Sequence, residues 1–180
     1  MKHFTVMSIL LWVFLYGCEQ KKPDKQKNVL FILVDDLGWK DLGYMGSDFY
    51  ETPNVDRLAS DGWIFTDAYA ASPVCSPTRA AIMSGKYPAR IQLTDWIPGN
   101  RHYGPHKDQK LAADPFQLQL DHNEITLAEV MKNAGYRTFF AGKWHLGETE
   151  AYYPDSQGFE FNIGGNNTGT PRGGYFSPYK

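Results

Sequence analysis

The 180-residue chain is 42% hydrophobic and carries 18 basic against 20 acidic side chains, for a formal net charge of −2. The apolar fraction excludes an intrinsically disordered chain, and the charge balance lacks the basic excess of a nucleic-acid-binding domain. A chain of this length allows one globular domain.

The first residues predict an export signal. A basic start precedes an apolar run over residues 4–16, which is shorter than the ~20 residues needed to span a bilayer. The run ends in "LYGC", which resembles the bacterial lipobox and implies that Cys18 becomes the lipid-carrying first residue of the mature protein. A plain secretory signal and an uncleaved anchor stay open as alternatives.

The chain is thereby predicted to have three parts: a lipoprotein-type signal at residues 1–17, a tether at 18–27 and a folded region at 28–180. The tether contains "KKPDKQK", a charged composition typical of flexible linkers. We expect the protein to be exported to the bacterial cell envelope, in the periplasm or at the outer membrane, where only a lipid would attach it to the membrane.

The first elements of the folded region alternate between strand and helix. The apolar, branched run Val29–Val34 predicts a strand that is buried on both faces, as in parallel sheets. A helix is predicted from Pro53, with Thr52 as its cap and Gly62 as its end. Residues 63–70 are expected to form a short strand.

A second helix is predicted over residues 76–83, with Gly85 as its end. Residues 92–123 that follow show no periodicity, and a loop of this length is usually functional or packed over a site. Three of its residues could line a sugar subsite or could equally belong to an ordinary surface: Trp96, Arg101 and His102.

The third helix carries the clearest signals. Thr126 and Glu129 have the spacing of a capping box, and Gly135 can end the helix. Residues 136–142 then predict another strand. This order of elements predicts an α/β fold with a mostly parallel central sheet flanked by helices.

Polar side chains follow three predicted strands, at the edge of the sheet where ligands gather in open α/β folds. Asp35 and Asp36 follow the first strand, Cys75 the second, and Lys143 and His145 the third. Two adjacent carboxylates suit a hard cation such as Ca²⁺ if the chain turns there. In an extended segment, Lys143 and His145 would face the same side, which suits an anionic substrate.

Each of these residues also has an ordinary structural interpretation. The two aspartates could be a solvated pair, Cys75 a buried core residue, and Lys143 and His145 an exposed lysine and a hydrogen-bonded structural histidine. A thiolate phosphatase would use Cys75 and Arg79, but Pro77 removes one of the backbone donors that such a phosphate loop needs.

Three stretches together resemble the sulfatase family. "CSPTRAAIMSGKYP" fits its C-x-P-x-R signature, "GKWHLG" its second signature, and "NVLFILVDDLGWKDLGYMG" its opening strand and metal loop. The resemblance runs from about Asn28 to the C-terminus and implies an alkaline-phosphatase-like fold, of which the chain would be the N-terminal portion. It also implies hydrolysis of sulfate esters, on a sulfated carbohydrate or an aryl sulfate.

The resemblance implies that a separate maturing enzyme oxidises Cys75 to 3-oxoalanine (formylglycine), whose hydrated aldehyde attacks sulfur with one hydroxyl and expels sulfate with the other. Asp35 and Asp36 would bind calcium together with residue 75. Arg79 would stabilise the ionised diol, and Lys143 and His145 would contact the sulfate and the diol. Further ligands and a leaving-group acid, which the family supplies from later segments, are not identifiable in this sequence.

Two alternatives to a sulfatase stay open. One is a phosphonate or phosphate monoester hydrolase of the same superfamily, which shares the cysteine motif. The other is a catalytically inactive lipoprotein that binds sulfated glycan.

Overall fold

A computed structural model describes residues 26–97, 110, 115–171 and 173–177. The chain divides into two units, Met1–Leu37 and Gly38–Lys180. The predicted signal, Cys18 and most of the tether lie outside the described residues, as do Arg101 and His102. No helix within the described ranges is long and apolar enough to cross a bilayer.

In the first unit, the predicted strand at Val29–Val34 is wrong. These residues are extended without forming a strand, and their apolar side chains are exposed, with Leu30 85% accessible. A strand requires a neighbour for its backbone hydrogen bonds, and no described residue pairs with this segment. The apolar run therefore ends in a turn at Asp35–Asp36 without having formed a ladder.

Helix α2 (Pro53–Asp61) begins and ends where the sequence predicts. Pro53 occupies its first turn and Gly62 its C-cap. Thr52 is the N-cap, as predicted, although its side chain makes no capping bond. Its hydroxyl instead accepts from the Gly43 amide at 2.8 Å and donates to Asp56 Oδ1 at 2.9 Å. These bonds fasten α2 to the short 3₁₀ helix η1 (Gly43–Met45).

The strand predicted at residues 63–70 is also wrong. Its residues have no regular secondary structure apart from a turn at Thr66–Asp67, and Trp63 is 90% exposed. The physical reason is the same as for Val29–Val34: no described residue offers this segment a hydrogen-bonded neighbour.

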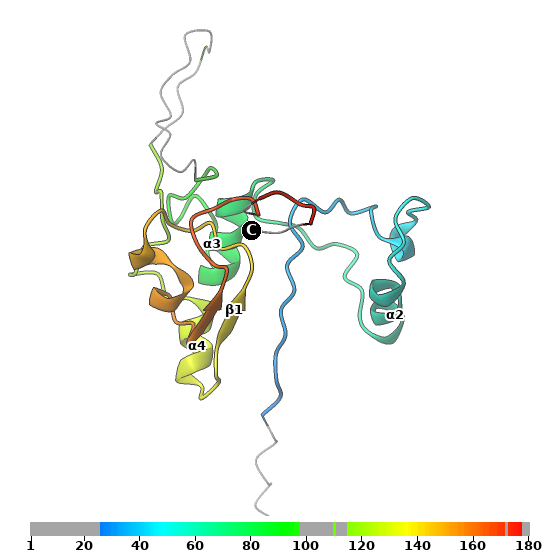
Figure 1. The fold of residues 1–180 in the computed structure, drawn as a ribbon, viewed down its shortest axis with the longest axis horizontal. Coiled ribbons are helices and arrows are strands. Elements are labelled where there is room, and N and C mark those ends of the chain that lie inside the picture. The colour runs from blue at the N-terminus through cyan, green and yellow to red at the C-terminus, as the bar shows by residue number, and fades with distance from the viewer. Residues whose placement is uncertain (1–25, 98–109, 111–114, 172, 178–180) are drawn as a thin grey trace, which may run out of the picture. The chain divides into compact units, whose positions relative to one another are not determined.

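Two further helices pack against each other: α3 (Cys75–Ser84) and α4 (Leu127–Asn133) (Figure 1). Gly85 ends α3 in a left-handed conformation, with φ of 67°, which glycine adopts without steric cost. The capping box of α4 is present in both directions, since the Thr126 hydroxyl accepts from the Glu129 amide at 3.2 Å and Glu129 Oε2 accepts from the Thr126 amide at 2.7 Å.

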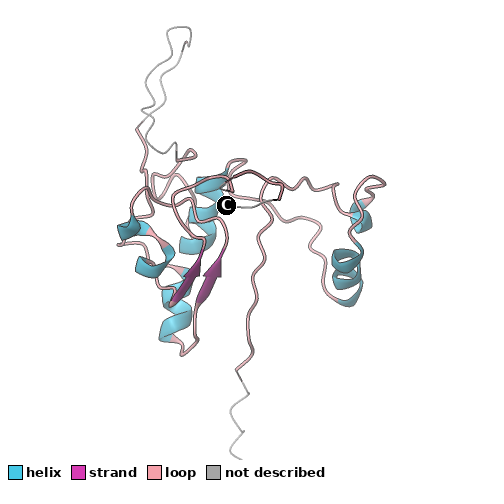
Figure 2. Ribbon diagram, viewed as in Figure 1, coloured by secondary structure: helices cyan, strands magenta, loops and turns pink. Residues whose placement is uncertain are grey.

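The described residues form a sheet of two parallel strands, β1 (Phe139–Ala141) and β2 (Phe161–Ile163) (Figure 2). The register pairs Phe139 with Phe161 and Ala141 with Ile163. β1 confirms the strand predicted over residues 136–142, and the parallel pairing confirms the predicted sheet type. β2 was not predicted, because it lies in a stretch rich in glycine and asparagine. Between the strands lie two 3₁₀ helices, η2 (Glu150–Tyr152) and η3 (Pro154–Ser156).

The hydrophobic core joins α3 to the segments that follow α3 and β1. Trp144 is its largest buried side chain, at 1% exposure. Trp144 packs edge-on against Phe140 and Phe159 and donates from Nε1 to the Tyr152 carbonyl at 2.8 Å. The other members of the buried cluster are Ala80, Ile91, Leu93, Ile97, Leu120 and Leu146.

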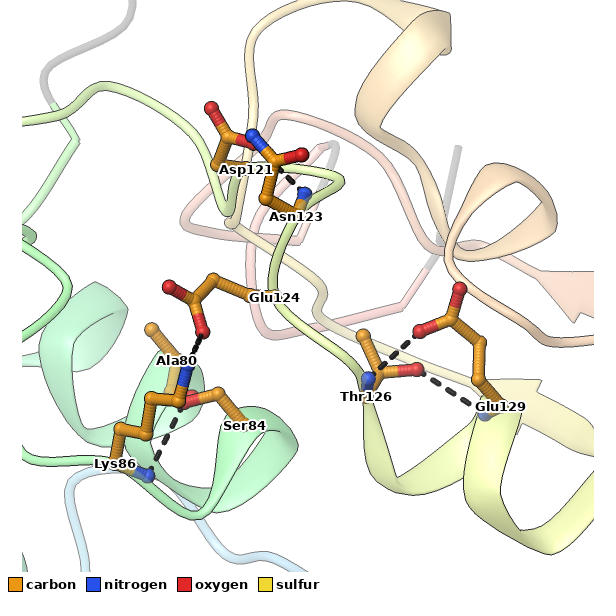
Figure 3. Close-up of polar contacts among 8 residues, drawn as sticks. All are labelled: Ala80, Ser84, Lys86, Asp121, Asn123, Glu124, Thr126 and Glu129. Atoms are coloured by element: carbon orange, nitrogen blue, oxygen red, sulfur yellow. Dashed lines mark hydrogen bonds and ion pairs between the residues drawn. The ribbon is translucent and has the colours of Figure 1, made fainter.

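Polar contacts join the end of α3 to the turn before α4 (Figure 3). Lys86, just beyond α3, forms an ion pair with Glu124. The Ser84 hydroxyl donates to the Ala80 carbonyl at 2.7 Å and accepts from the Lys86 amide at 3.3 Å. The end of the helix that begins at Cys75 is therefore held to the start of α4.

Candidate active site

Cys75 is the first residue of α3 and is half-buried, with a free thiol. The segment before Cys75 is hydrogen-bonded to the helix, because the Thr78 hydroxyl accepts from the Ser72 amide at 3.0 Å and donates to the Ser72 carbonyl. The next residues turn inward, since Ser76 is fully buried and Arg79 is 9% exposed. The local fold thus leaves the Cys75 side chain accessible on a helix that is otherwise fixed to the core.

Lys143 and His145 follow β1, and hydrogen bonds to backbone atoms connect their segment to α3. Arg79 Nη1 donates to the Lys143 carbonyl. His145 Nε2 lies 2.8 Å from the Ile97 carbonyl oxygen, while the Ile97 amide donates to the buried Ser76 hydroxyl at 3.0 Å. The structure therefore brings the "CSPTR" and "GKWHLG" segments together, although the strand predicted before the first of them is not formed.

The predicted extended conformation of this segment is wrong at His145. Its φ is 58°, a left-handed conformation that is uncommon outside glycine and clusters at functional sites. The side chain is 5% exposed. Simple alternation of faces therefore does not describe the segment, and Trp144 enters the core while the His145 ring reaches Ile97.

The segment that contains Asn166 and Gly169 also contacts His145. The His145 amide donates to the Asn166 carbonyl at 3.1 Å. The backbone of Gly169 approaches the ring so closely that a Cβ there would lie 2.8 Å from His145 Cε1. A side chain at residue 169 would occupy the space of the imidazole, so the glycine permits this approach.

Asp35 and Asp36 form the turn that two adjacent carboxylates would need in order to face one ion. Asp36 has φ of 55°, and both residues are exposed. Carboxylate oxygens are the donors that Ca²⁺ prefers, but the ion takes six to eight oxygens. Among the described residues no group of three or more His, Cys, Asp or Glu side chains is assembled for a metal. The chemistry of the pair fits a calcium ion, with the aspartates as part of its ligand set.

Several residues of this site were not predicted. Ile97 and Asn166 contribute backbone atoms, which leave no signal in a sequence. Gly169 lies in a glycine-rich stretch, and the sequence alone does not indicate which of these glycines packs against the His145 ring. Ser76 lies inside the quoted cysteine motif, yet its buried hydroxyl was given no role.

A family model described as Sulfatase matches residues 27–174. The chain belongs to the sulfatase family. The N-acetylgalactosamine-6-sulfatases of Canis lupus familiaris and Sus scrofa are 37% identical over 177 residues and 39% identical over 179 residues, and each match covers 97% of this chain and 31% of the relative. Arylsulfatase G of Rattus norvegicus is 36% identical over 160 residues, covering 88% of this chain and 28% of the relative.

Two solved structures show the same fold. Ps i-CgsB matches with a TM-score of 0.59 and 34% identity, covering 73% of this chain and 27% of that one. A Bacteroides thetaiotaomicron protein, BT33336S-sulf, matches with a TM-score of 0.56 and 35% identity over 71% of this chain and 26% of that one. The predicted α/β, alkaline-phosphatase-like class is confirmed, and this sulfatase chain spans about a third of the length of the curated relatives it matches.

Proposed function

We propose that this sulfatase chain carries part of the catalytic site of an enzyme that hydrolyses sulfate esters. The observation that supports this most is the meeting of the two signature segments, in which Arg79 and Ser76 of α3 are tied through backbone atoms to Lys143 and His145. This arrangement supports a shared site for Cys75, the half-buried first residue of α3, and the lysine and histidine that follow β1.

Cys75 is proposed as the residue that a maturing enzyme converts to formylglycine. Its place at the start of α3, half-buried and free of a disulfide, fits a side chain that must be reached first by the maturing enzyme and later by substrate. Formylglycine supplies a hydrated aldehyde, whose hydroxyl is the nucleophile toward sulfur. The N–H groups at the start of a helix favour negative charge at this position.

The surrounding residues are assigned to holding the anionic substrate. Lys143 contributes an ammonium group and His145 an imidazole that its backbone contacts keep in one orientation. Arg79 adds a permanent positive charge in the same helix as Cys75. Such preorganised donors are each commonly worth about 3 kcal/mol in transition-state stabilisation. Asp35 and Asp36 would hold a calcium ion, which would supply further positive charge.

The substrate class is proposed to be a sulfated carbohydrate, with an aryl sulfate as a simpler surrogate. Relatives are named N-acetylgalactosamine-6-sulfatases, and Ps i-CgsB was solved in complex with k-i-k-neocarrahexaose. Trp96 precedes Ile97, whose backbone contacts both Ser76 and His145, and it is partly exposed, so it could line a sugar subsite. We further propose export to the bacterial envelope and a lipid anchor at Cys18.

The test is to express the protein with a sulfatase-maturing enzyme, identify residue 75 by mass spectrometry and assay an aryl sulfate against the matching aryl phosphate. Formylglycine at residue 75 and preferential cleavage of the sulfate would support the proposal. Preference for the phosphate would favour a phosphate or phosphonate monoester hydrolase. An unmodified thiol in the presence of the maturing enzyme, with glycan binding but no turnover, would favour the inactive lipoprotein.

A further inference from the structure

Ser76 is a fully buried polar residue with no part in the proposed chemistry. It lies next to Cys75 in α3 at 0% exposure, and its hydroxyl accepts from the Ile97 amide at 3.0 Å. The bond joins residues that are 21 positions apart in the chain. A buried hydroxyl that bonds to the backbone of a distant segment helps to fix the position of that segment.

Ile97 connects Ser76 to His145 through its two backbone polar groups. Ile97 is 2% exposed, so water does not satisfy its amide and carbonyl, and both must find partners inside the protein. The amide donates to Ser76 and the carbonyl lies 2.8 Å from His145 Nε2. Because Ile97 precedes a proline, its own backbone is restricted to extended conformations. Displacing the amide therefore displaces the carbonyl.

The bond to Ile97 decides which ring nitrogen of His145 carries the hydrogen. A carbonyl oxygen can only accept, so Nε2 must be the donor. In the neutral imidazole, Nδ1 is then the acceptor nitrogen. The opposite tautomer would place two acceptors against each other at 2.8 Å.

We propose that Ser76 is a positioning residue that fixes the Nε2–H tautomer and the orientation of His145 through the backbone of Ile97. Ser76 itself does not touch the reacting atoms. It acts by holding the Ile97 carbonyl at the place where only one tautomer of the ring can donate to it. The inference rests on the proposed function in so far as His145 acts on the sulfate ester.

The test is nitrogen-15 NMR of the His145 ring in the full chain without substrate, comparing the unmutated protein with Ser76→Ala. We expect Nε2–H alone in the unmutated protein. In Ser76→Ala, the Nδ1–H form should become populated, and the Nε2 proton should exchange with water on the order of tenfold faster, as expected for the loss of one buried hydrogen bond. Ser76→Thr keeps the hydroxyl and should keep the original pattern.

Ser84→Ala is the matched control, because it removes a hydroxyl from the same helix that, among the described residues, bonds to the Ala80 carbonyl and the Lys86 amide. It should leave the ring signals unchanged. Identical ring signals in Ser76→Ala and the unmutated protein would overturn the proposal. An Nδ1–H tautomer in the unmutated protein would overturn it without any variant, so the test does not depend on whether Ser76→Ala folds.

The outcome is separable from that of the proposed function. The ring tautomer is measured without turnover, so a protein that fails to hydrolyse sulfate esters would count against the function and leave the Ser76–Ile97–His145 connection standing. In an active enzyme, Ser76→Ala should lower kcat with little change in KM. Ser76→Thr should keep kcat near that of the unmutated protein, and Ser84→Ala should change neither kcat nor KM.

Discussion

Replacing Gly169 by alanine tests how closely the glycine-rich segment covers His145. A Cβ at residue 169 would lie 2.8 Å from Cε1 and 3.1 Å from Nδ1 of the ring, whereas carbon atoms pack at about 3.5–4.0 Å. Either the ring or the segment would have to move by roughly 0.7–1.2 Å. The ring is held at Nε2 by Ile97, so its movement would strain or break that hydrogen bond.

Two opposing effects decide the sign of the change in stability. Gly169 does not adopt a left-handed φ, so alanine is compatible with the backbone and would by itself stabilise by about 0.4–1 kcal/mol through the unfolded state. Overpacking a close contact costs about 1–3 kcal/mol. The overpacking should dominate, and we expect the free energy of unfolding to fall by roughly 0.5–2 kcal/mol.

Urea unfolding of Gly169→Ala, alone and combined with His145→Ala, measures whether the ring is the obstacle. Once the ring is absent, the alanine should no longer clash, and its effect should reverse to a stabilisation of about 0.4–1 kcal/mol. Equal destabilisation in both backgrounds would refute this reasoning, because the added methyl group would then be colliding with something other than His145.

Four further substitutions test the core, the site and two ion pairs. Trp144→Ala should lower the free energy of unfolding by about 3–5 kcal/mol in urea titrations, because it empties a buried aromatic site; a loss below about 1 kcal/mol would contradict the assigned packing. Lys143→Ala should lower turnover of a sulfate ester by roughly 10²–10³ while keeping the Arg79 bond, which uses the backbone carbonyl of residue 143, and the exposed Lys132→Ala serves as its control. Lys86→Ala should lower the free energy of unfolding in urea titrations by less than about 1 kcal/mol, because its ion pair with Glu124 is partly exposed. A larger loss would contradict this reasoning and show that the ion pair stabilises the fold more than a partly exposed pair should. The Thr138 amide, with Arg137 beside it, lowers the pKa of Glu160 from its ordinary value of 4.5. The stabilisation by this carboxylate is therefore present above pH 4.5 and is lost as pH falls through the lower folded-state pKa. Glu160→Gln should accordingly be less stable than the unmutated protein at neutral pH in urea titrations, and this difference should disappear under acid conditions.

The helices could be predicted because their signals are local. The capping box of Thr126 and Glu129 lies within a single turn and forms both of its bonds. Gly85 ends α3 because its own backbone can take a left-handed φ. Pro53 likewise marks the start of α2 by its own geometry. None of these features depends on a distant part of the chain.

The strands were predicted less well because a strand is defined by its neighbour. The composition of Val29–Val34 favours a buried strand, yet these residues have no ladder partner among the described residues. Phe161–Ile163 does form a strand in a stretch rich in glycine and asparagine, because Phe139–Ala141 lies beside it in register. Sequence reports the preference of a segment, whereas pairing depends on which other segment reaches it.

The candidate site shows the same contrast between local signals and contacts with distant segments. Motifs name the residue types at positions 75, 79, 143 and 145, but backbone carbonyls hold two of them: that of Lys143 accepts from Arg79, and those of Ile97 and Asn166 contact His145. Every residue carries such a carbonyl, so no pattern of side chains reveals which ones are used. Two residues that make these contacts possible do so through the type of their side chain. Ser76 places a hydroxyl acceptor inside the core, and Gly169 has no side chain that would collide with the ring. Substitutions at Ser76 and Gly169 should therefore disturb His145 more than a conservative change in the side chain of Ile97, whose contribution to the ring is made by its backbone.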